Sequence, residues 1–196
     1  MTTKKIRNVL EHYKQLDESE LVKMLKQGKE LALTELINRY QKTVARVVIG
    51  MLGNTPEAED VGQETFIRFW SSVENYRHDA KVSTFLTRIA INLSINELRR
   101  RKKRYEWLDF LEDKKYKNIT IIESDQYIQT DEQEHITKAL ASIEPDQRAV
   151  VILRLVQGYS TKETADMLEI PLGTVLSRLS RALEKLRIEI IKLEEI

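Results

Sequence analysis

The sequence predicts an all-α fold made of two small helical domains joined by a linker. Only three prolines and six glycines occur in 196 residues, which leaves little turn material for an all-β fold. Apolar residues recur at helical spacing along most of the chain, and these segments begin at capping patterns or end at glycines. Residues 105–131 interrupt the pattern and divide the chain into two parts.

The first two predicted helices fill residues 17–53. Asp17 and Glu20 stand in capping-box spacing before LVKMLKQ, and Gly28 is placed to end that short helix. A long core helix follows from Lys29 and continues until Gly53. Its apolar residues keep helical spacing and are Leu33, Leu36, Ile37, Tyr40, Val44, Val47, Val48 and Met51.

Two more helices are predicted before residue 105. Thr55 and Pro56 form an N-cap and first-turn pair for the third helix. Residues 75–82 lack periodicity and are predicted to form a loop, after which Ser83 caps the fourth helix. The apolar residues of the third helix include Val61, Phe66, Phe69, Trp70 and Val73. The predicted buried stripe of the fourth helix is Leu86, Ile89, Ala90, Leu93 and Leu98.

Residues 105–131 mix aromatic, β-leaning and polar segments, and we expect an extended or partly disordered linker there. Helical spacing resumes near Glu132 and pauses at Glu144 and Pro145. The next predicted helix covers residues 146–157 and ends before Gly158. Its predicted core residues are Val150, Val151, Leu153 and Leu155.

Residues 160–187 are predicted to form a helix, a tight turn and a second helix. Ser160 and Glu163 have capping-box spacing, and Pro171 either ends the first helix or opens the second. The predicted core stripe of the second helix is Val175, Leu179, Leu183, Leu186 and Ile190.

The opposite arc of that second helix is polar and mostly basic. A helix-turn-helix places its second helix in the DNA major groove, where Arg and Lys hold guanine or phosphate. The alternative is the solvated face of an ordinary helical hairpin, but the short first helix, the turn and the basic arc together favour DNA. The residues of the arc are Thr174, Ser177, Arg178, Arg181 and Lys185.

Charge is strongly segregated along the chain although the net charge is only +1. Residues 76–104 contain nine Lys or Arg against Asp79 and Glu97, a net charge of +7. Residues 105–134 contain three Lys against nine Asp or Glu, a net charge of −6. Such blocks usually form solvated surface, but a concentrated positive face is also typical of a nucleic-acid partner.

Composition argues against several other classes of protein. The chain has no cysteine, which rules out disulfides and thiolate zinc sites, and its three histidines are far apart in sequence. We expect no metal site, no cofactor and no catalytic activity, because no phosphate loop or nucleophile motif is present. No signal-peptide pattern and no apolar run of roughly 18 residues occurs, so we expect a soluble cytoplasmic protein without membrane insertion.

Three stretches together resemble bacterial RNA polymerase sigma factors of the extracytoplasmic-function (ECF) class, which have only domains two and four. They are AEDVGQETFIRFW at residues 58–70, YRHDAKVSTFLTRIAINLSINELRRRKKR at 76–104, and PLGTVLSRLSRALEKLR at 171–187. The resemblance covers roughly residues 18–104 and 132–190. It implies domain two at residues 1–104, an acidic flexible linker at 105–131, and domain four at 132–196.

The resemblance implies that Asp60, Gln63 and Glu64 dock on the β′ clamp helices of core polymerase, whereas Phe66 turns inward. The alternative is a solvated acidic helix face. It also implies that the loop at residues 76–82 pockets a flipped base of the minus-10 element, and that domain four contacts the β flap. The residues it assigns to minus-10 DNA are Tyr76, Arg77, Lys81, Phe85, Arg88, Asn92, Asn96, Arg99 and Arg100. Those it assigns to minus-35 DNA are Thr174, Ser177, Arg178, Arg181 and Lys185. For Phe85, a place in the core is an equal alternative.

The sequence departs from the family pattern at three positions. Gly62 replaces a larger apolar residue in the polymerase-binding helix, at a cost of roughly 1 kcal/mol in helix preference. Glu169 stands where many relatives have glycine, and a positive φ there would cost on the order of 1 kcal/mol. Leu176 stands where a basic residue is frequent, so one phosphate contact is expected to be missing.

The resemblance further implies a function in promoter recognition and transcription initiation, with core RNA polymerase, promoter DNA and an anti-sigma factor as partners. The alternative is a stand-alone helix-turn-helix regulator that binds duplex DNA as a symmetric dimer. A third interpretation, an RNA-binding accessory protein, rests only on the basic run RRRKKR.

Overall fold

The computed structural model of the protein describes residues 11–76, 80–111 and 131–194. Within these ranges the chain forms helices, turns and connecting segments but no strand, which confirms the all-α prediction. The predicted linker lies outside the described residues from 112 to 130. None of the helices in the described part is long and apolar enough to cross a bilayer.

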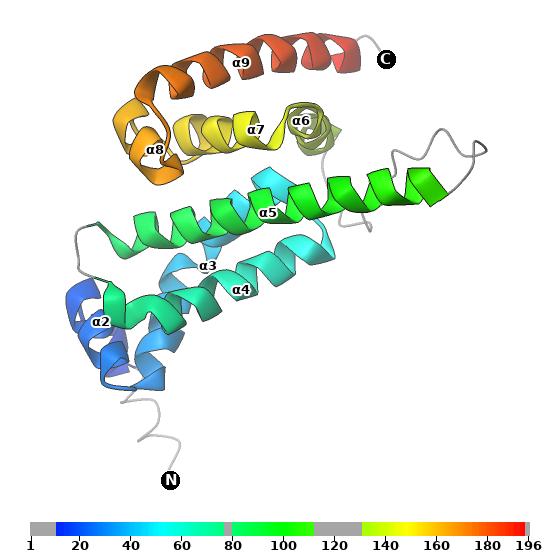
Figure 1. Cartoon of the computed structure of the whole chain (residues 1–196). Coiled ribbons are helices and arrows are strands. Elements are labelled where there is room, and N and C mark those ends of the chain that lie inside the picture. Colours follow the sequence, from blue (N-terminus) through cyan, green and yellow to red (C-terminus); the bar gives the residue numbers. More distant parts are fainter. Residues whose placement is uncertain (1–10, 77–79, 112–130, 195–196) are drawn as a thin grey trace.

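Four helices form the N-terminal bundle, namely α2 (Glu18–Lys26), α3 (Glu30–Leu52), α4 (Pro56–Ser72) and α5 (Val82–Leu111), with a 3-10 turn, η1 (Val73–Asn75), after α4. The predicted caps are present: Asp17 and Glu20 form a capping box, and the Thr55 hydroxyl accepts a hydrogen bond from the amide of Ala58. Gly28 has a φ of 77°, which suits the residue after a helix. Figure 1 shows α3, α4 and α5 packed beside one another, with α2 at the end next to the N-terminus.

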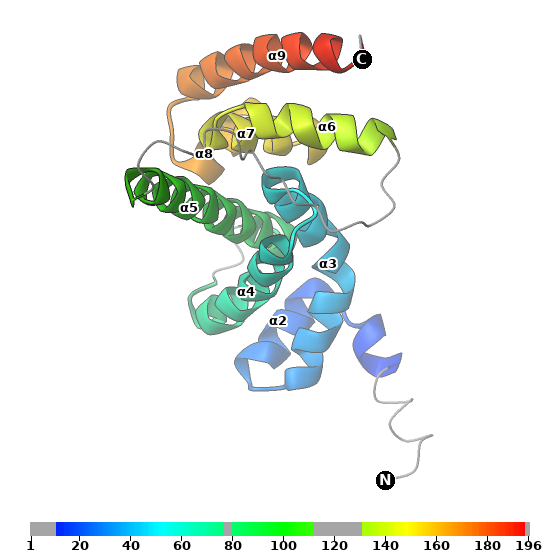
Figure 2. The ribbon, with the colours of Figure 1, turned by 90° about the vertical axis from the view of Figure 1, so that its right-hand side faces the viewer.

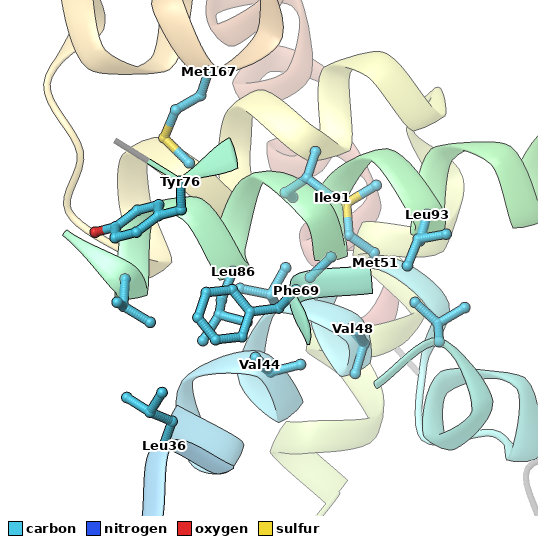
Figure 3. Packing of buried hydrophobic residues seen from close by; sticks show 14 of the residues in the cluster. Leu36, Val44, Val48, Met51, Phe69, Tyr76, Leu86, Ile91, Leu93 and Met167 are labelled. Carbon is cyan, nitrogen blue, oxygen red and sulfur yellow. The ribbon is translucent and has the colours of Figure 1, made fainter. Parts of the chain in front are cut away.

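The core of the N-terminal bundle fills the space between α3, α4 and α5. Phe69 of α4 is fully buried and points toward Leu36 and Val44 of α3 and Leu86 of α5 (Figure 3). Most of the predicted apolar residues of these helices are buried or pack against this cluster. Trp70 is an exception and is 49% exposed, because residues one apart on a helix lie about 100° apart and Phe69 takes the inward position.

Helix α5 differs from its prediction at both ends. It begins at Val82, so Ser83 lies inside the first turn, and the Val82 amide donates instead to Glu18 at 3.0 Å. The helix continues to Leu111, well past residue 104 where the linker was expected to begin. The part of the extension whose side chains are described, up to Trp107, is largely exposed and so gives periodicity no buried stripe to detect, but the segment contains neither glycine nor proline to stop the helix.

The C-terminal bundle contains α6 (Asp131–Ser142), α7 (Pro145–Val151), the π-helical turn η2 (Ile152–Val156), α8 (Thr161–Leu168) and α9 (Leu172–Glu194). Helix α9 covers one side of α6 and α7, and the N-terminal bundle lies on their other side (Figures 1 and 2). Gly158, with a φ of 76°, leads into α8. The predicted helix-turn-helix is therefore confirmed as α8 and α9.

Three residues expected in the C-terminal core are exposed. Leu155 lies in η2, where the wider π-helical turn rotates it outward and leaves Ile152 and Leu153 buried. In α9 the buried residues are Val175, Ala182 and Leu186, with Leu179 partly buried, a spacing of four, three and four. Leu183 and Ile190 fall off this line and face outward, because Ala182 takes the inward position that was expected of Leu183.

The capping box at the start of α8 is expected to stabilise the protein measurably. The Ser160 hydroxyl accepts from the Glu163 amide at 3.2 Å, and the Glu163 carboxylate accepts from the Ser160 amide at 2.7 Å. We expect Ser160→Ala to lower the free energy of unfolding by about 1 kcal/mol in urea denaturation. The control Thr161→Ala, one residue further on, should change it by less than about 0.5 kcal/mol. Equal losses in the two variants would show that the cap is not the cause.

Candidate nucleic-acid interface

Helix α4 presents an acidic surface with exposed apolar neighbours. Asp60 and Gln63 are exposed, and Glu64, which is partly exposed, accepts an i,i+4 hydrogen bond from Arg68 at 2.8 Å. Ile67 and Trp70 are exposed on the same helix. The three residues predicted to bind polymerase therefore lie one turn apart on an accessible helix surface with apolar area beside them. This combination of charge and exposed aromatic area is typical of a protein-binding surface.

Sequence reasoning missed a groove beside this surface. It has a volume of about 390 Å³ and lies between α3 and α4. A Cβ atom built on Gly62 would lie 4.0 Å from Val48 Cγ2, so the absence of a side chain at Gly62 leaves the groove open. Phe66, expected to turn inward, is partly buried and lines the groove as well as packing on the core. The signal in the sequence was the unexpected glycine. Other lining residues include Ile37, Val44, Ile49, Ala58 and Gln63.

Two aromatic residues assigned to minus-10 DNA pack into the protein. Tyr76 is buried, and its hydroxyl donates to the carbonyl oxygen of Ala80. The centroid of its ring lies 5.4 Å from that of Phe85 and 6.4 Å from that of Phe69 in edge-on contacts, and the Phe69 and Phe85 centroids are 6.0 Å apart. Tyr76, assigned to minus-10 DNA, is therefore packed against the core in this structure, and Phe85 takes its alternative place beside the core. Arg77 lies outside the described residues.

The remaining minus-10 candidates are Lys81, just before α5, and residues along α5. Lys81, Asn92 and Asn96 are exposed. Arg100 is exposed and pairs with Glu97 at 2.8 Å. Two other arginines contact carboxylates of the C-terminal bundle: Arg88 pairs with Glu169, and Arg99 lies 3.3 Å from Asp146.

Glu97 and Arg101 fix the basic helix to the start of α4, a role that sequence reasoning did not assign. Arg101 is mostly covered and donates to Glu97 at 3.2 Å, to Glu57 at 3.1 Å and to the Thr55 hydroxyl at 3.2 Å. The pKa of Glu57 lies below its usual value. The Glu57 carboxylate accepts a hydrogen bond from its own backbone amide, and the charge of Arg101 and a hydrogen bond from the Thr55 hydroxyl lower the pKa further. Glu97 was the visible signal, as a carboxylate next to a run of six cations.

The second helix of the helix-turn-helix carries the minus-35 candidates. Ser177, Arg181 and Lys185 are exposed, and Thr174 is partly exposed. Arg178 is only 27% exposed and donates to Asp146 at 3.0 Å.

Two of the departures from the family pattern, Leu176 and Glu169, lie in the helix-turn-helix and are visible in the structure. Leu176 is exposed on α9, so an apolar side chain occupies this position of the surface. Glu169 has a φ of 55° and is the one non-glycine residue with a positive φ in the described part of the chain. The condition stated for strain at Glu169, a positive φ, is therefore met. Within the same ranges, no three His, Asp or Glu side chains are grouped as metal ligands would be.

Comparisons with known proteins agree with this geometry. The family model for Sigma-70 region 2 matches residues 36–104, and that for Sigma-70, region 4 matches residues 133–186. The chain is 30% identical over 175 residues to the ECF RNA polymerase sigma factor SigW of Bacillus subtilis, covering 85% of this chain and 92% of SigW. It is also 30% identical over 179 residues to the ECF RNA polymerase sigma-E factor of Escherichia coli, covering 87% and 92% of the two chains.

A solved structure shares the fold. The sigma factor RpoE of Bartonella quintana, in complex with the anti-sigma factor NepR, superposes with a TM-score of 0.63 at 24% identity, covering 81% of this chain and 96% of that one. The matches to both sigma-70 regions and the near full-length relatives establish the family. This chain belongs to the ECF class of RNA polymerase sigma factors, and its function is promoter recognition in transcription initiation.

Proposed function

We propose that this sigma factor divides its work between its two helical bundles. Residues 1–104 bind core polymerase and open the minus-10 element, residues 132–196 read the minus-35 element as duplex, and residues 105–131 connect them. The observation that carries the proposal is that exposed polar and basic side chains line α5, whereas a separate exposed set lines α9. Two weak sites on one chain gain avidity when their spacing fits the promoter.

Polymerase binding is assigned to the exposed surface of α4. Asp60, Gln63 and Glu64 offer carboxylate and amide groups to basic or donor groups of the β′ clamp helices. The groove between α3 and α4 adds an apolar surface that a partner side chain can fill. The C-terminal bundle contacts the β flap. The chain itself catalyses no reaction, because bond formation belongs to the polymerase.

Minus-10 recognition is assigned to Lys81, just before α5, and to the exposed side chains of α5. Lys81 and Arg100 follow phosphates, and Asn92 and Asn96 bond base edges or sugars once the strands separate. Minus-35 recognition is assigned to α9, where Arg178 or Arg181 can take the O6 and N7 atoms of guanine and Lys185 a phosphate. Arg88, Arg99 and Arg178 can take these roles only after leaving their carboxylate partners.

The chain acts in the cytoplasm and is held inactive by an anti-sigma factor. Support comes from solved relatives of the same fold, since the Bartonella quintana protein was crystallised with an anti-sigma factor and CnrH with the cytosolic domain of CnrY. A stand-alone helix-turn-helix regulator has no support in the comparisons. Such a regulator would shift duplex DNA in a gel without polymerase.

Separate duplex and single-strand roles predict opposite responses to a premelted promoter. On a promoter mapped by transcription with core polymerase, Arg181→Ala should weaken the closed complex by about 1–3 kcal/mol, and a premelted bubble at minus 10 should not restore it. Asn92→Ala should leave the closed complex nearly intact, slow opening, and be largely rescued by the bubble.

The measurement is polymerase binding and opening on duplex against bubble templates. Arg187→Ala is the matched control for Arg181, because both are exposed arginines of α9 and Arg187 lies outside the predicted reading surface. If the Arg181 and Asn92 variants respond alike to the bubble, the division of work is wrong.

A further inference from the structure

Helix α2 contacts both ends of the segment that joins η1 to α5, which we call the connecting segment (residues 76–82). Of this segment, Tyr76 and residues 80–82 are described. In Figure 1, α2 lies at the same end of the N-terminal bundle as the last turn of α4 and the start of α5. The contacts are made by the first and the last residue of α2, Glu18 and Lys26. One helix therefore holds the connecting segment at both ends.

Lys26 holds the first end through backbone carbonyls. Its ammonium group donates to the carbonyl oxygen of Tyr76 at 2.8 Å and approaches that of Glu74 in η1 at 3.5 Å. Carbonyl groups at the end of a helix lack partners within it and carry partial negative charge, which a cation complements. Lys26 is partly buried, whereas Lys23 on the same helix is exposed. The ammonium group thus fixes the orientation of the peptide unit that follows Tyr76.

Glu18 holds the second end at the start of α5. One of its carboxylate oxygens accepts a hydrogen bond from the Val82 amide at 3.0 Å, and the other accepts one from the hydroxyl of Tyr40 on α3. Amide groups in the first turn of a helix lack partners within it, and the helix dipole favours a carboxylate there. Burial raises the pKa of Tyr40 and the bond to Glu18 raises it further, so the hydroxyl remains a donor at neutral pH. Glu18 therefore caps α5 from another helix, in a direction that Tyr40 fixes.

The backbone of Lys81 is held on both sides by these contacts. Its carbonyl oxygen accepts a hydrogen bond from the Phe85 amide at 3.1 Å, and the N–H of the same peptide unit, that of Val82, donates to Glu18. The Lys81 side chain is nevertheless exposed. A cation on a fixed backbone is suited to hold a phosphate at one place, because less conformational entropy is lost when a preorganised group binds.

We propose that Glu18 and Lys26 are positioning residues for the minus-10 element: from α2 they hold both ends of the connecting segment, and so place Lys81 and the first turn of α5 against the unpaired strand. About 12 Å of rigid helix separates the two residues along the axis of α2. The proposal rests on the proposed function, which assigns Lys81 and α5 to minus-10 DNA. Losing either contact should therefore weaken binding of that strand without weakening polymerase binding.

Two substitutions release the ends one at a time. Lys26→Met keeps the length of the side chain but loses the donor, and Lys26→Arg restores a donor. Glu18→Ala removes both bonds of the carboxylate. Glu18→Gln keeps one acceptor oxygen and should give a smaller effect of the same kind, which provides a second variant if the alanine variant does not fold. The matched controls are Lys23→Met, at an exposed lysine of α2, and Glu30→Ala, at an exposed first-turn glutamate of α3.

A spin label next to Lys81 tests whether the ends are released. The chain has no cysteine and Ala80 is exposed, so Ala80→Cys provides a single labelling site. In the polymerase-free protein, the electron paramagnetic resonance spectrum should show more label motion with Glu18→Ala or Lys26→Met than in the otherwise native chain. Lys26→Arg and both controls should leave the spectrum unchanged. Equal label motion in all variants would overturn the proposal.

The consequence for DNA is measured with core polymerase and a single-stranded oligonucleotide that carries the non-template minus-10 sequence of a mapped promoter. Glu18→Ala and Lys26→Met should each bind it about tenfold less tightly, as expected if the released Lys81 keeps its binding position about one-tenth of the time. Lys26→Arg and the controls should bind like native protein. A scrambled oligonucleotide of the same composition should show a much smaller loss, whereas general damage to the fold would weaken both alike.

Combining the two substitutions tests whether they act through one segment. Glu18→Ala with Lys26→Met should lose little more affinity for the minus-10 oligonucleotide than the weaker-binding single variant, because release of one end already frees the segment. Losses that multiply in the double variant, or equal losses on the minus-10 and scrambled oligonucleotides, would overturn the proposal.

Variants of the proposed DNA contacts separate failure of this proposal from failure of the proposed function. If Asn92→Ala weakens binding to the minus-10 oligonucleotide but the Glu18 and Lys26 variants bind like native protein, only the positioning role is wrong. If Asn92→Ala and Lys81→Ala both bind like native protein, the minus-10 role of α5 fails, and the positioning role fails with it whatever the label shows.

Discussion

Replacing Asp60 and Glu64 together by lysine is expected to abolish stable binding to core RNA polymerase while leaving the fold intact. Both side chains are at least partly exposed on α4, so the substitutions disturb no buried group. In the complex they would meet donors on the polymerase that become buried and unpaired when the carboxylates are lost, and the new like charges would repel them. Truncating one partner of such a pair typically costs about 2–5 kcal/mol of association.

The measurement is a titration of labelled chain with core polymerase, with circular dichroism to confirm that the variant remains helical. Asp166→Lys with Glu184→Lys is the matched control, because it makes the same charge change on exposed residues of α8 and α9. The control should bind nearly as well as native protein. Unchanged affinity of the α4 variant would show that this surface does not bind polymerase.

Phe69→Ala is expected to lower the free energy of unfolding by about 3–5 kcal/mol. Phe69 is fully buried between α3 and α5, and it contacts both Tyr76 and Phe85. The substitution leaves a cavity at the centre of the N-terminal bundle and removes the ring on which Tyr76 rests. Loss of a large part of the stability of a domain of this size is the consequence.

Urea denaturation followed by circular dichroism measures this loss. Phe69→Leu, which keeps most of the apolar volume, should cost less than the alanine variant. The neighbouring Trp70→Ala should have a much smaller effect, because Trp70 is half exposed. A Phe69→Ala variant no less stable than Trp70→Ala would contradict the core described for α3, α4 and α5.

Much of the fold could be predicted because its signals are local. The capping boxes at Asp17 and Ser160 and the cap at Thr55 are set by residues three positions apart, and all are present in the structure. The position of Glu169, where many relatives have glycine, likewise marked the residue that has a positive φ in the turn after α8. These features depend on neighbours in sequence, which periodicity and capping patterns describe well.

The features that could not be predicted depend on contacts between distant residues. Whether Tyr76 faces DNA or the core is decided by Phe69 and Phe85, which approach it only after folding. Arg178 looked like a free cation on α9, yet Asp146 of α7 lies 3.0 Å away. The same applies to Gly50, whose partner Ile152 lies in the other bundle. A single sequence contains no signal for such pairings.

Run-off transcription with core polymerase and genomic DNA tests most directly whether this chain gives polymerase its promoter specificity. Core polymerase with the native chain should produce discrete transcripts whose start sites share minus-35 and minus-10 elements. Core polymerase alone, or with the Asp60→Lys and Glu64→Lys variant, should not produce them. The same start sites with and without the native chain would contradict the central claim.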